Sequence, residues 1–239
     1  NAAQGDLGMS YSAKKPVVDR MLEALPGTVM LAGTALVFTL LYALPAGIIS
    51  AVNRNKWVDY VLRSLSFVGV SMPSFWLGLV LIYIFGLKLG LVPIATSRIT
   101  PIGVILPAAT LAVVIGSKYM RQVRLVILEE MEKDYVIGAR ARGVSEMKIL
   151  FGHILPNAVL PLITILGVVM GWLLGGVAVV EMVFSWPGLG NMAVYAITMR
   201  DYPLIEGFVL WVALAYMCIN ALIDASYVLL DPRLKRERA

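Results

Sequence analysis

The chain has 239 residues, of which 59% are hydrophobic and 15% are charged, and its formal net charge is +5. Soluble domains carry about a quarter charged residues, so this composition indicates a protein whose surface lies largely in lipid. The basic residues are scattered through short connecting segments, a pattern typical of the cytoplasmic side of a membrane protein and not of a nucleic-acid-binding patch.

A helix that crosses a bilayer needs roughly 20 predominantly apolar residues. Five stretches are predicted as spans: Thr28–Val52, Ser64–Leu87, Ile99–Ser117, Ile154–Val180 and Gly207–Ile223. Pro26 fits the start of the first helix, and the third helix is expected to continue past Lys118. The sequence therefore predicts an all-α integral membrane protein with a lead-in segment (1–27), a membrane domain (28–230) and a basic tail (231–239).

A sixth uncharged stretch, Met182–Met199, reads "MVFSWPGLGNMAVYAITM". Pro187, Gly188 and Gly190 would interrupt a spanning helix near its middle. We therefore expect a broken, partly re-entrant segment, which is tolerated at membrane depth only where protein or water covers its backbone.

The distribution of basic residues predicts the orientation. With five spans, Asn53–Arg63, Lys118–His153 and the tail share one side and carry 3, 7 and 4 Lys and Arg residues, 14 in all, against 6 on the other side. The basic side is expected to be cytoplasmic. The tail is then inside, whereas residues 1–27 and the broken segment are outside. Because this orientation places the N-terminal segment outside the membrane, it also predicts a further helix before Asn1.

The most polar connection, residues 129–156, is predicted to be a cytoplasmic loop with two short helices on the membrane surface. Ser145 is a good N-cap for the second helix. Its apolar positions repeat at helical spacing: Met147, Leu150, Phe151 and Ile154. Tyr135, Val136 and Ala139 form a short face before it, and Gly143 permits a turn between the two.

The corner of this loop consists of small residues flanked by arginines. Ala139 and Ala141 alternate with Arg140 and Arg142, directly before Gly143. Small side chains allow another protein's backbone to approach, and arginines can hydrogen-bond to it. The alternative reading is a solvated linker whose apolar side rests on lipid headgroups.

Neither a G-x-x-x-x-G-K-[ST] loop nor a G-x-G-x-x-G turn after a strand is present, so the chain carries no recognisable nucleotide-binding motif. His153 is the only histidine, which excludes an H-E-x-x-H metal motif. We expect no enzyme activity, no metal and no cofactor bound by this chain itself.

Several residues on the predicted outer side are candidates for a gate. Glu181 and Asp201, with Glu206, lie near the broken segment and either face the translocation mouth or pair with Arg200 and cap helices. Trp186, Pro187 and Gly188 form the break itself, although Trp186 also fits simple packing. Asp224, at the opposite, inner end of the last span, either lies at membrane depth, where ionisable groups usually face protein or water, or sits at the inner interface beside the basic tail.

"ARARG" (Ala139–Gly143), nine further residues and "HILP" (His153–Pro156) resemble the cytoplasmic signature loop of ATP-binding-cassette (ABC) importer permeases. Tyr135 before the motif is similar to the peptide/nickel branch, whereas Ile137 and Gly138 depart from the Glu that often opens it. Further segments match in order along nearly the whole chain: "GDLGMS", "VGVSMPSFWLG", "VFSWPGLG", "RDYP" and "LDPR".

The resemblance implies a type I ABC importer transmembrane domain, with six family spans of which five are present here. It implies a multi-pass protein of a prokaryotic cytoplasmic membrane, in contact with lipid and not with nucleic acid. Its partners would be a second, similar permease, two ATPases that supply ATP and Mg²⁺, and an extracytoplasmic substrate-binding protein.

In this family the loop docks on the ATPases, and the resemblance carries that role to these residues: Tyr135, Ala139, Arg140, Ala141, Arg142, Gly143 and Ser145. The cargo of the branch is short peptides or chelated nickel, and the sequence leaves both open. The rival class is an ion-driven carrier or channel, which would need charged groups within the spans. Asp224 is the only candidate for such a group.

Overall fold

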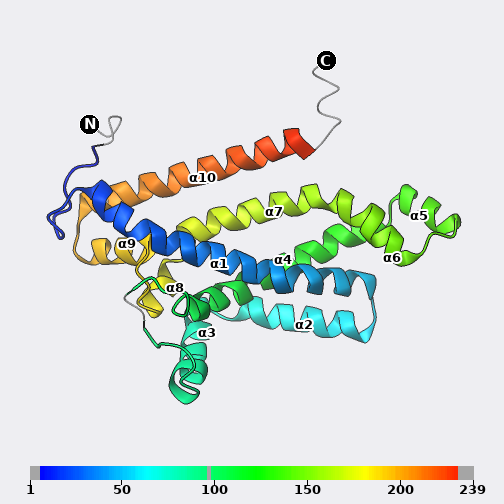
Figure 1. Ribbon diagram of the computed structural model, residues 1–239, viewed down its shortest axis with the longest axis horizontal. Coiled ribbons are helices and arrows are strands. Elements are labelled where there is room, and N and C mark those ends of the chain that lie inside the picture. Colours follow the sequence, from blue (N-terminus) through cyan, green and yellow to red (C-terminus); the bar gives the residue numbers. More distant parts are fainter. Residues whose placement is uncertain (1–5, 96–97, 231–239) are drawn as a thin grey trace. The chain divides into compact units, whose positions relative to one another are not determined.

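The computed structural model describes residues 6–95 and 98–230, and its elements are drawn in Figure 1. The described residues form helices and turns, with one isolated bridge between Met9 and Pro16 and no strand. The elements, with η marking π-helical segments, are α1 (Val17–Val52), α2 (Trp57–Ser71), α3 (Ser74–Leu81), η2 (Ile82–Lys88), α4 (Ile105–Met131), α5 (Asp134–Ala141), α6 (Glu146–Ile149), η3 (Leu150–Ile154), α7 (Leu155–Gly176), α8 (Ala178–Val183), α9 (Leu189–Thr198) and α10 (Tyr202–Leu230).

The chain divides into two compact units. The first comprises Asn1–Phe38, Met72–Val114 and Met170–Ile219, and the second comprises Thr39–Ser71, Ile115–Val169 and Asn220–Ala239. The long helices α1, α4, α7 and α10 contribute residues to both units. The outer-segment residues from Glu181 to Asp201 fall in the first unit, and the loop 129–156 falls in the second.

The first helix is longer than predicted, because it begins at Val17 and not at Pro26. Pro16 stands directly before the helix, where its missing backbone N–H removes no helical hydrogen bond. Val17 and Met21 are buried in a cluster with Leu189, which holds the additional turns in place. The predicted boundary at residue 27 therefore lies inside α1.

The second predicted span is not one continuous helix. α2 ends at Ser71 and α3 begins at Ser74. Pro73 has no N–H to donate, and its ring disfavours helical geometry at Met72. Pro73, a proline inside an apolar span, therefore accounts for the break.

By helix length and composition, fewer than the five predicted spans stand out as single helices. Among the described residues, three helical stretches are long and apolar enough to cross a membrane: Val17–Val52, Glu146–Leu173 and Tyr202–Ala225. The count rises to four if α2 and α3–η2 form one broken span. α4 is not among them, because its second half carries Lys118, Arg121 and Arg124, although it does continue past Lys118 as expected.

The break predicted within Met182–Met199 is confirmed. α8 ends at Val183 and α9 begins at Leu189, with Ser185 in the left-handed region (φ 52°) between them. Pro187 and Gly188 lie in this connection, where neither interrupts a helix. The basic tail predicted for residues 231–239 lies outside the described residues.

Close packing of small residues holds the second unit together. A Cβ placed on Gly47 of α1 would lie 2.7 Å from the backbone oxygen of Met120 and 2.7 Å from Val123 Cβ, both on α4. Membrane helices use glycine in this way, because lipid supplies no hydrophobic drive for association and close contact must replace it.

Replacing Gly47 with Ala is expected to destabilise the protein by about 1–3 kcal/mol, because α4 would have to move away. The measurement is the thermal unfolding of the purified protein in detergent. Gly33→Ala is the matched control on the same helix, since a Cβ there meets nothing within 4 Å. Equal melting temperatures for both variants would contradict the close-packing interpretation.

Candidate functional site

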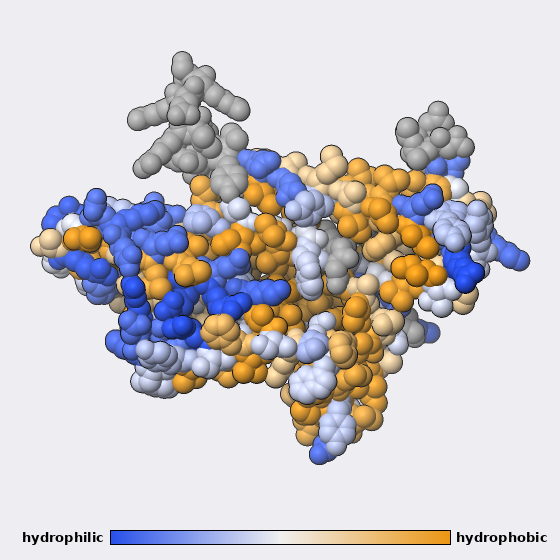
Figure 2. Space-filling view, turned by 180° about the vertical axis from the view of Figure 1, so that it is seen from behind, coloured by the Kyte–Doolittle hydropathy of each residue, from blue (hydrophilic) through white to orange (hydrophobic). Residues whose placement is uncertain are grey.

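The loop between α4 and α7 turns at Gly143, as the sequence predicted. Gly143 has φ +76°, a conformation that favours glycine. α5 ends just before this turn, and Ser145 stands in extended geometry before α6, although its side chain makes no capping bond. Figure 2 shows hydrophilic side chains gathered over the end of the second unit where α5 and α6 lie.

The second helix of the loop is not a separate surface helix. α6 runs through η3 into α7 without a break in the helical hydrogen bonding. The predicted apolar stripe is therefore half wrong: Leu150 and Ile154 are buried, whereas Met147 and Phe151 are 66% and 60% exposed. The π-helical hydrogen bonds of η3 change the direction in which successive side chains leave the helix. A prediction that assumes 3.6 residues per turn throughout therefore assigns some of these side chains to the wrong face.

Most of the predicted coupling residues lie on the surface, with one exception. The exposed ones are Tyr135, Arg140, Ala141, Arg142, Gly143 and Ser145. Ala139 is only 1% exposed, because it packs with Val136 and Ile149 in the core of its own unit. Its side chain is therefore not part of a docking surface, which corrects the prediction.

Two side chains of α5 are anchored by carboxylates. The Tyr135 hydroxyl donates to Glu130 Oε2 at 2.6 Å, and burial together with this bond raises the pKa of Tyr135 to about 12. Arg140 donates from Nε and Nη2 to Glu146 at 2.8 and 3.1 Å, across the Gly143 turn. The corner is thus held at both ends, while Ala141 and Arg142 remain exposed.

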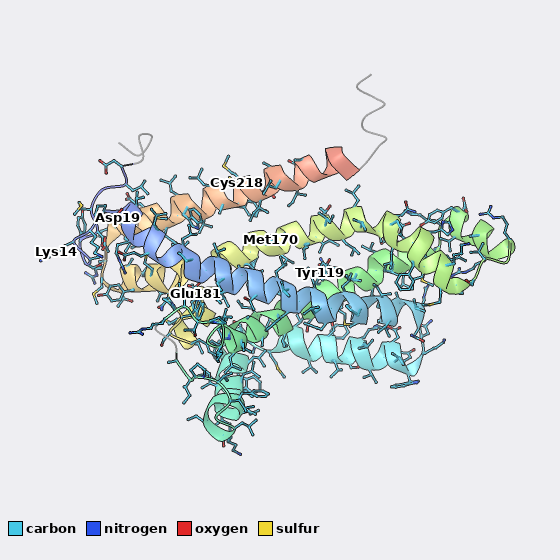
Figure 3. All side chains as sticks on the ribbon, viewed as in Figure 1. Lys14, Asp19, Tyr119, Met170, Glu181 and Cys218 are labelled. Carbon is cyan, nitrogen blue, oxygen red and sulfur yellow. The ribbon has the colours of Figure 1, made fainter. Side chains whose placement is uncertain are left out.

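Glu181, in the first unit, is a fully buried carboxylate on α8, directly before the broken segment (Figure 3). It accepts hydrogen bonds from Thr28 Oγ1 at 2.7 Å and from the Asn191 backbone N–H at 2.9 Å. Thr28 Oγ1 in turn accepts from the Leu189 N–H at 2.8 Å. Glu181 therefore closes the start of α9 and ties it to α1.

The residues of the break are equally enclosed. Trp186 is fully buried, and its Nε1 donates to the backbone oxygen of Gly27 at 2.8 Å. A Cβ on Gly188 would lie 2.2 Å from Glu181 Oε1, so only glycine leaves room for that carboxylate. Of the readings that the sequence left open, helix capping fits Glu181 and packing fits Trp186, since both side chains are buried.

Asp201 is also fully buried and does not pair with Arg200, since no salt bridge of Arg200 occurs in the described ranges. It accepts from Ser10 Oγ at 2.6 Å and from Ser12 N and Oγ at 3.0 and 2.7 Å. Burial alone would raise the pKa of Asp201, but these hydrogen bonds outweigh it and hold the pKa below its usual range. Asp224, in contrast, is exposed on α10.

A cavity of about 470 Å³ opens between the N-terminal turn, the start of α1 and α9. Its lining includes the ion pair of Arg20 and Glu23, together with Pro187, Gly188 and Asn191. Pro187 and Gly188 are thus the two predicted gate residues that border open space in the first unit.

The sequence interpretation missed Thr28 and the pair of Asp59 with Arg124. Thr28 was only the first residue of an apolar stretch, and Asp59 one acid near a loop. Arg124 donates to both carboxylate oxygens of Asp59 at 2.8 Å each. No local pattern connects these positions, because Asp59 and Arg124 lie 65 residues apart and Thr28 lies 153 residues from Glu181.

Residues 43–236 match the family described as "Binding-protein-dependent transport system inner membrane component". The chain belongs to this family. It is 38% identical over 235 residues to the glutathione transport system permease protein GsiC of Escherichia coli, covering 98% of this chain and 76% of the relative. The corresponding proteins of Shigella dysenteriae and Shigella flexneri are 37% identical over the same shares.

Solved structures agree on the fold of this permease. An inward-facing MetNI methionine ABC transporter matches with a TM-score of 0.74 at 17% identity, over 88% of this chain and 96% of that one. An amino acid ABC transporter crystallised with histidines matches with a TM-score of 0.67 at 17% identity, over 87% and 92%. The protein is therefore an inner-membrane permease component of a binding-protein-dependent transport system.

Replacing Thr28 with Val is expected to destabilise this permease by about 1–3 kcal/mol, because Glu181 loses a donor and Leu189 N loses an acceptor. Thermal unfolding in detergent measures the loss. The control is Thr34→Val on the same helix, whose hydroxyl only bonds to the Met30 carbonyl within the helix. Unchanged stability for Thr28→Val would show that the buried network adds nothing.

Proposed function

We propose that this permease imports short peptides of the glutathione type, working with a second permease, two ATPases and an extracytoplasmic binding protein. The observation that carries the cargo class is the identity of 38%, over 98% of the chain, to a glutathione transport permease. The relatives described above name glutathione and not nickel, so peptide is favoured over the nickel alternative that the sequence left open.

In this proposal the ATPases bind ATP and Mg²⁺, and the exposed corner around Ala141 and Gly143 is the surface on which they dock. The exposed loop residues support this assignment, since Ala141 and Arg142 lie at the tip, between Arg140 and its hydrogen-bond partner Glu146. Ala139 supports the corner from inside. Because the chain belongs to a binding-protein-dependent transport family, an ATP-driven importer is favoured over an ion-driven carrier.

The cargo is tested with the complete complex in proteoliposomes, with its binding protein supplied on the outer side. We expect ATP-dependent uptake of labelled glutathione and of a dipeptide, and no uptake with a non-hydrolysable ATP analogue. A nickel chelate and an imposed ion gradient without ATP are the comparison conditions. Uptake of the nickel chelate alone, or uptake driven by the gradient, would overturn the proposal.

Replacing Ala141 with Trp is expected to abolish uptake while the protein still folds, because the bulky side chain holds the docking surfaces apart. Overpacking of this kind costs about 1–3 kcal/mol, which weakens ATPase association by roughly 5-fold to 150-fold. Co-purification of the ATPases, substrate-stimulated hydrolysis and uptake are measured together.

Ala141→Ser is the matched small replacement and should behave like the parent protein. Ala139→Trp should instead impair folding itself, since Ala139 is buried in the core. If Ala141→Trp transports at the parental rate, the loop is a solvated linker and not a docking surface.

A further inference from the structure

Asp59, in the second unit, joins three separate segments through one carboxylate. It lies in the first turn of α2 and is fully buried. Arg124 of α4 donates to Oδ1 and Oδ2 at 2.8 Å each, Ser50 of α1 donates to Oδ1 at 2.5 Å, and the Asn55 N–H donates to Oδ2 at 3.0 Å. Four donors from α1, the α1–α2 turn and α4 therefore meet on one side chain.

The chemistry of this junction makes it stiff. A planar guanidinium that donates two parallel bonds to a carboxylate fixes both the distance and the orientation of the pair. A carboxylate that leaves water is stable only when such donors stay in place. The end of α1 and the start of α2 therefore cannot shift against α4 at this level without exposing the Asp59 carboxylate to water or leaving it without its donors.

The junction is connected to the corner that carries Ala141. Arg124 lies about two turns before the end of α4, and Glu130 in the last turn accepts from Tyr135 of α5 and pairs with Lys133. On the surface, Arg54 of the α1–α2 turn pairs with Glu132 at 2.6 Å. A continuous set of contacts thus runs from α5 through α4 to the α1–α2 turn.

The covalent chain connects α5 to α4 through Glu132 and Lys133, and to α7 through α6 and η3, but it does not connect α5 directly to α1 or α2. Chain connectivity alone would not make α1 and α2 move when the loop is displaced. The contacts of Asp59 and Arg124 supply that missing connection.

We propose that Asp59 and Arg124 are positioning residues for coupling, which make α1 and α2 move together with α5 when the ATPases change state. This inference rests on the docking role proposed above for the loop. It requires no contact between Asp59 or Arg124 and any partner, because both act through α4.

The first test measures transport per ATP in the complete complex. Arg124→Gln is expected to keep ATP hydrolysis but to lower glutathione uptake per ATP about five-fold or more, within the usual range of coupling between sites. Arg124→Lys keeps the charge but not the paired geometry, so it should restore part of the coupling. The control is Arg121→Lys, one turn earlier on α4, whose cation lies 5.1 Å from the Phe67 ring and can be replaced by another cation.

The second test measures movement and separates this inference from the proposed cargo. Spin labels at Lys56→Cys in the α1–α2 turn and at Ile137→Cys on α5 are placed in a Cys218→Ser background. In the otherwise parental complex, one narrow distance should persist with and without ATP. In Arg124→Gln the distance should broaden or change when ATP binds.

A parental uptake-to-hydrolysis ratio in Arg124→Gln, or a narrow and unchanged label distance in that variant, would overturn the inference. If Arg124→Gln fails to assemble, the same two measurements on Arg124→Lys decide. A complex that binds ATP but does not import glutathione counts against the proposed cargo. The label distances, which need only nucleotide, still decide the role of Asp59 and Arg124.

Discussion

A carboxylate that is removed from water must accept hydrogen bonds from donors in the protein. This constraint sets much of the tertiary structure. Asp59, Glu181 and Asp201 are all fully buried. Removing one partner from a buried ion pair typically costs about 3–5 kcal/mol, and a buried group left without a hydrogen bond costs about 1–3 kcal/mol. Each of these acids is satisfied by donors from segments far away in the sequence, so each fixes how those segments meet.

The constraint matters more here than in a soluble protein, because helices in lipid gain little from hydrophobic association. In the first unit, Glu181 and Asp201 join the start of α1 and the N-terminal turn to the region from α8 to the start of α10. In the second unit, Asp59 does the same for α1, α2 and α4. Glycine contacts such as that of Gly47 then bring the backbones close between these fixed points.

Features encoded by one residue's own geometry were predictable from the sequence. The break at Pro187 and Gly188 and the turn at Gly143 depend on local backbone preferences, and both were placed correctly. Pro73 marks a break of the same kind inside the second predicted span. The burial of Ala139 depends on Ile149 across the turn, and the partners of Glu181 depend on the whole fold, so neither could be predicted from local sequence.

The π-helical segment Leu150–Ile154 has a consequence for how this loop is set against the membrane. Each residue of an α-helix turns the chain by about 100° around the helix axis, and a π-helical turn holds one residue more than the α-helical pattern calls for. Loss or gain of a single residue between Leu150 and Ile154 would therefore rotate α6 by roughly a quarter turn or more relative to α7. Evolution can redirect the docking corner by such an indel without changing any residue at the corner itself.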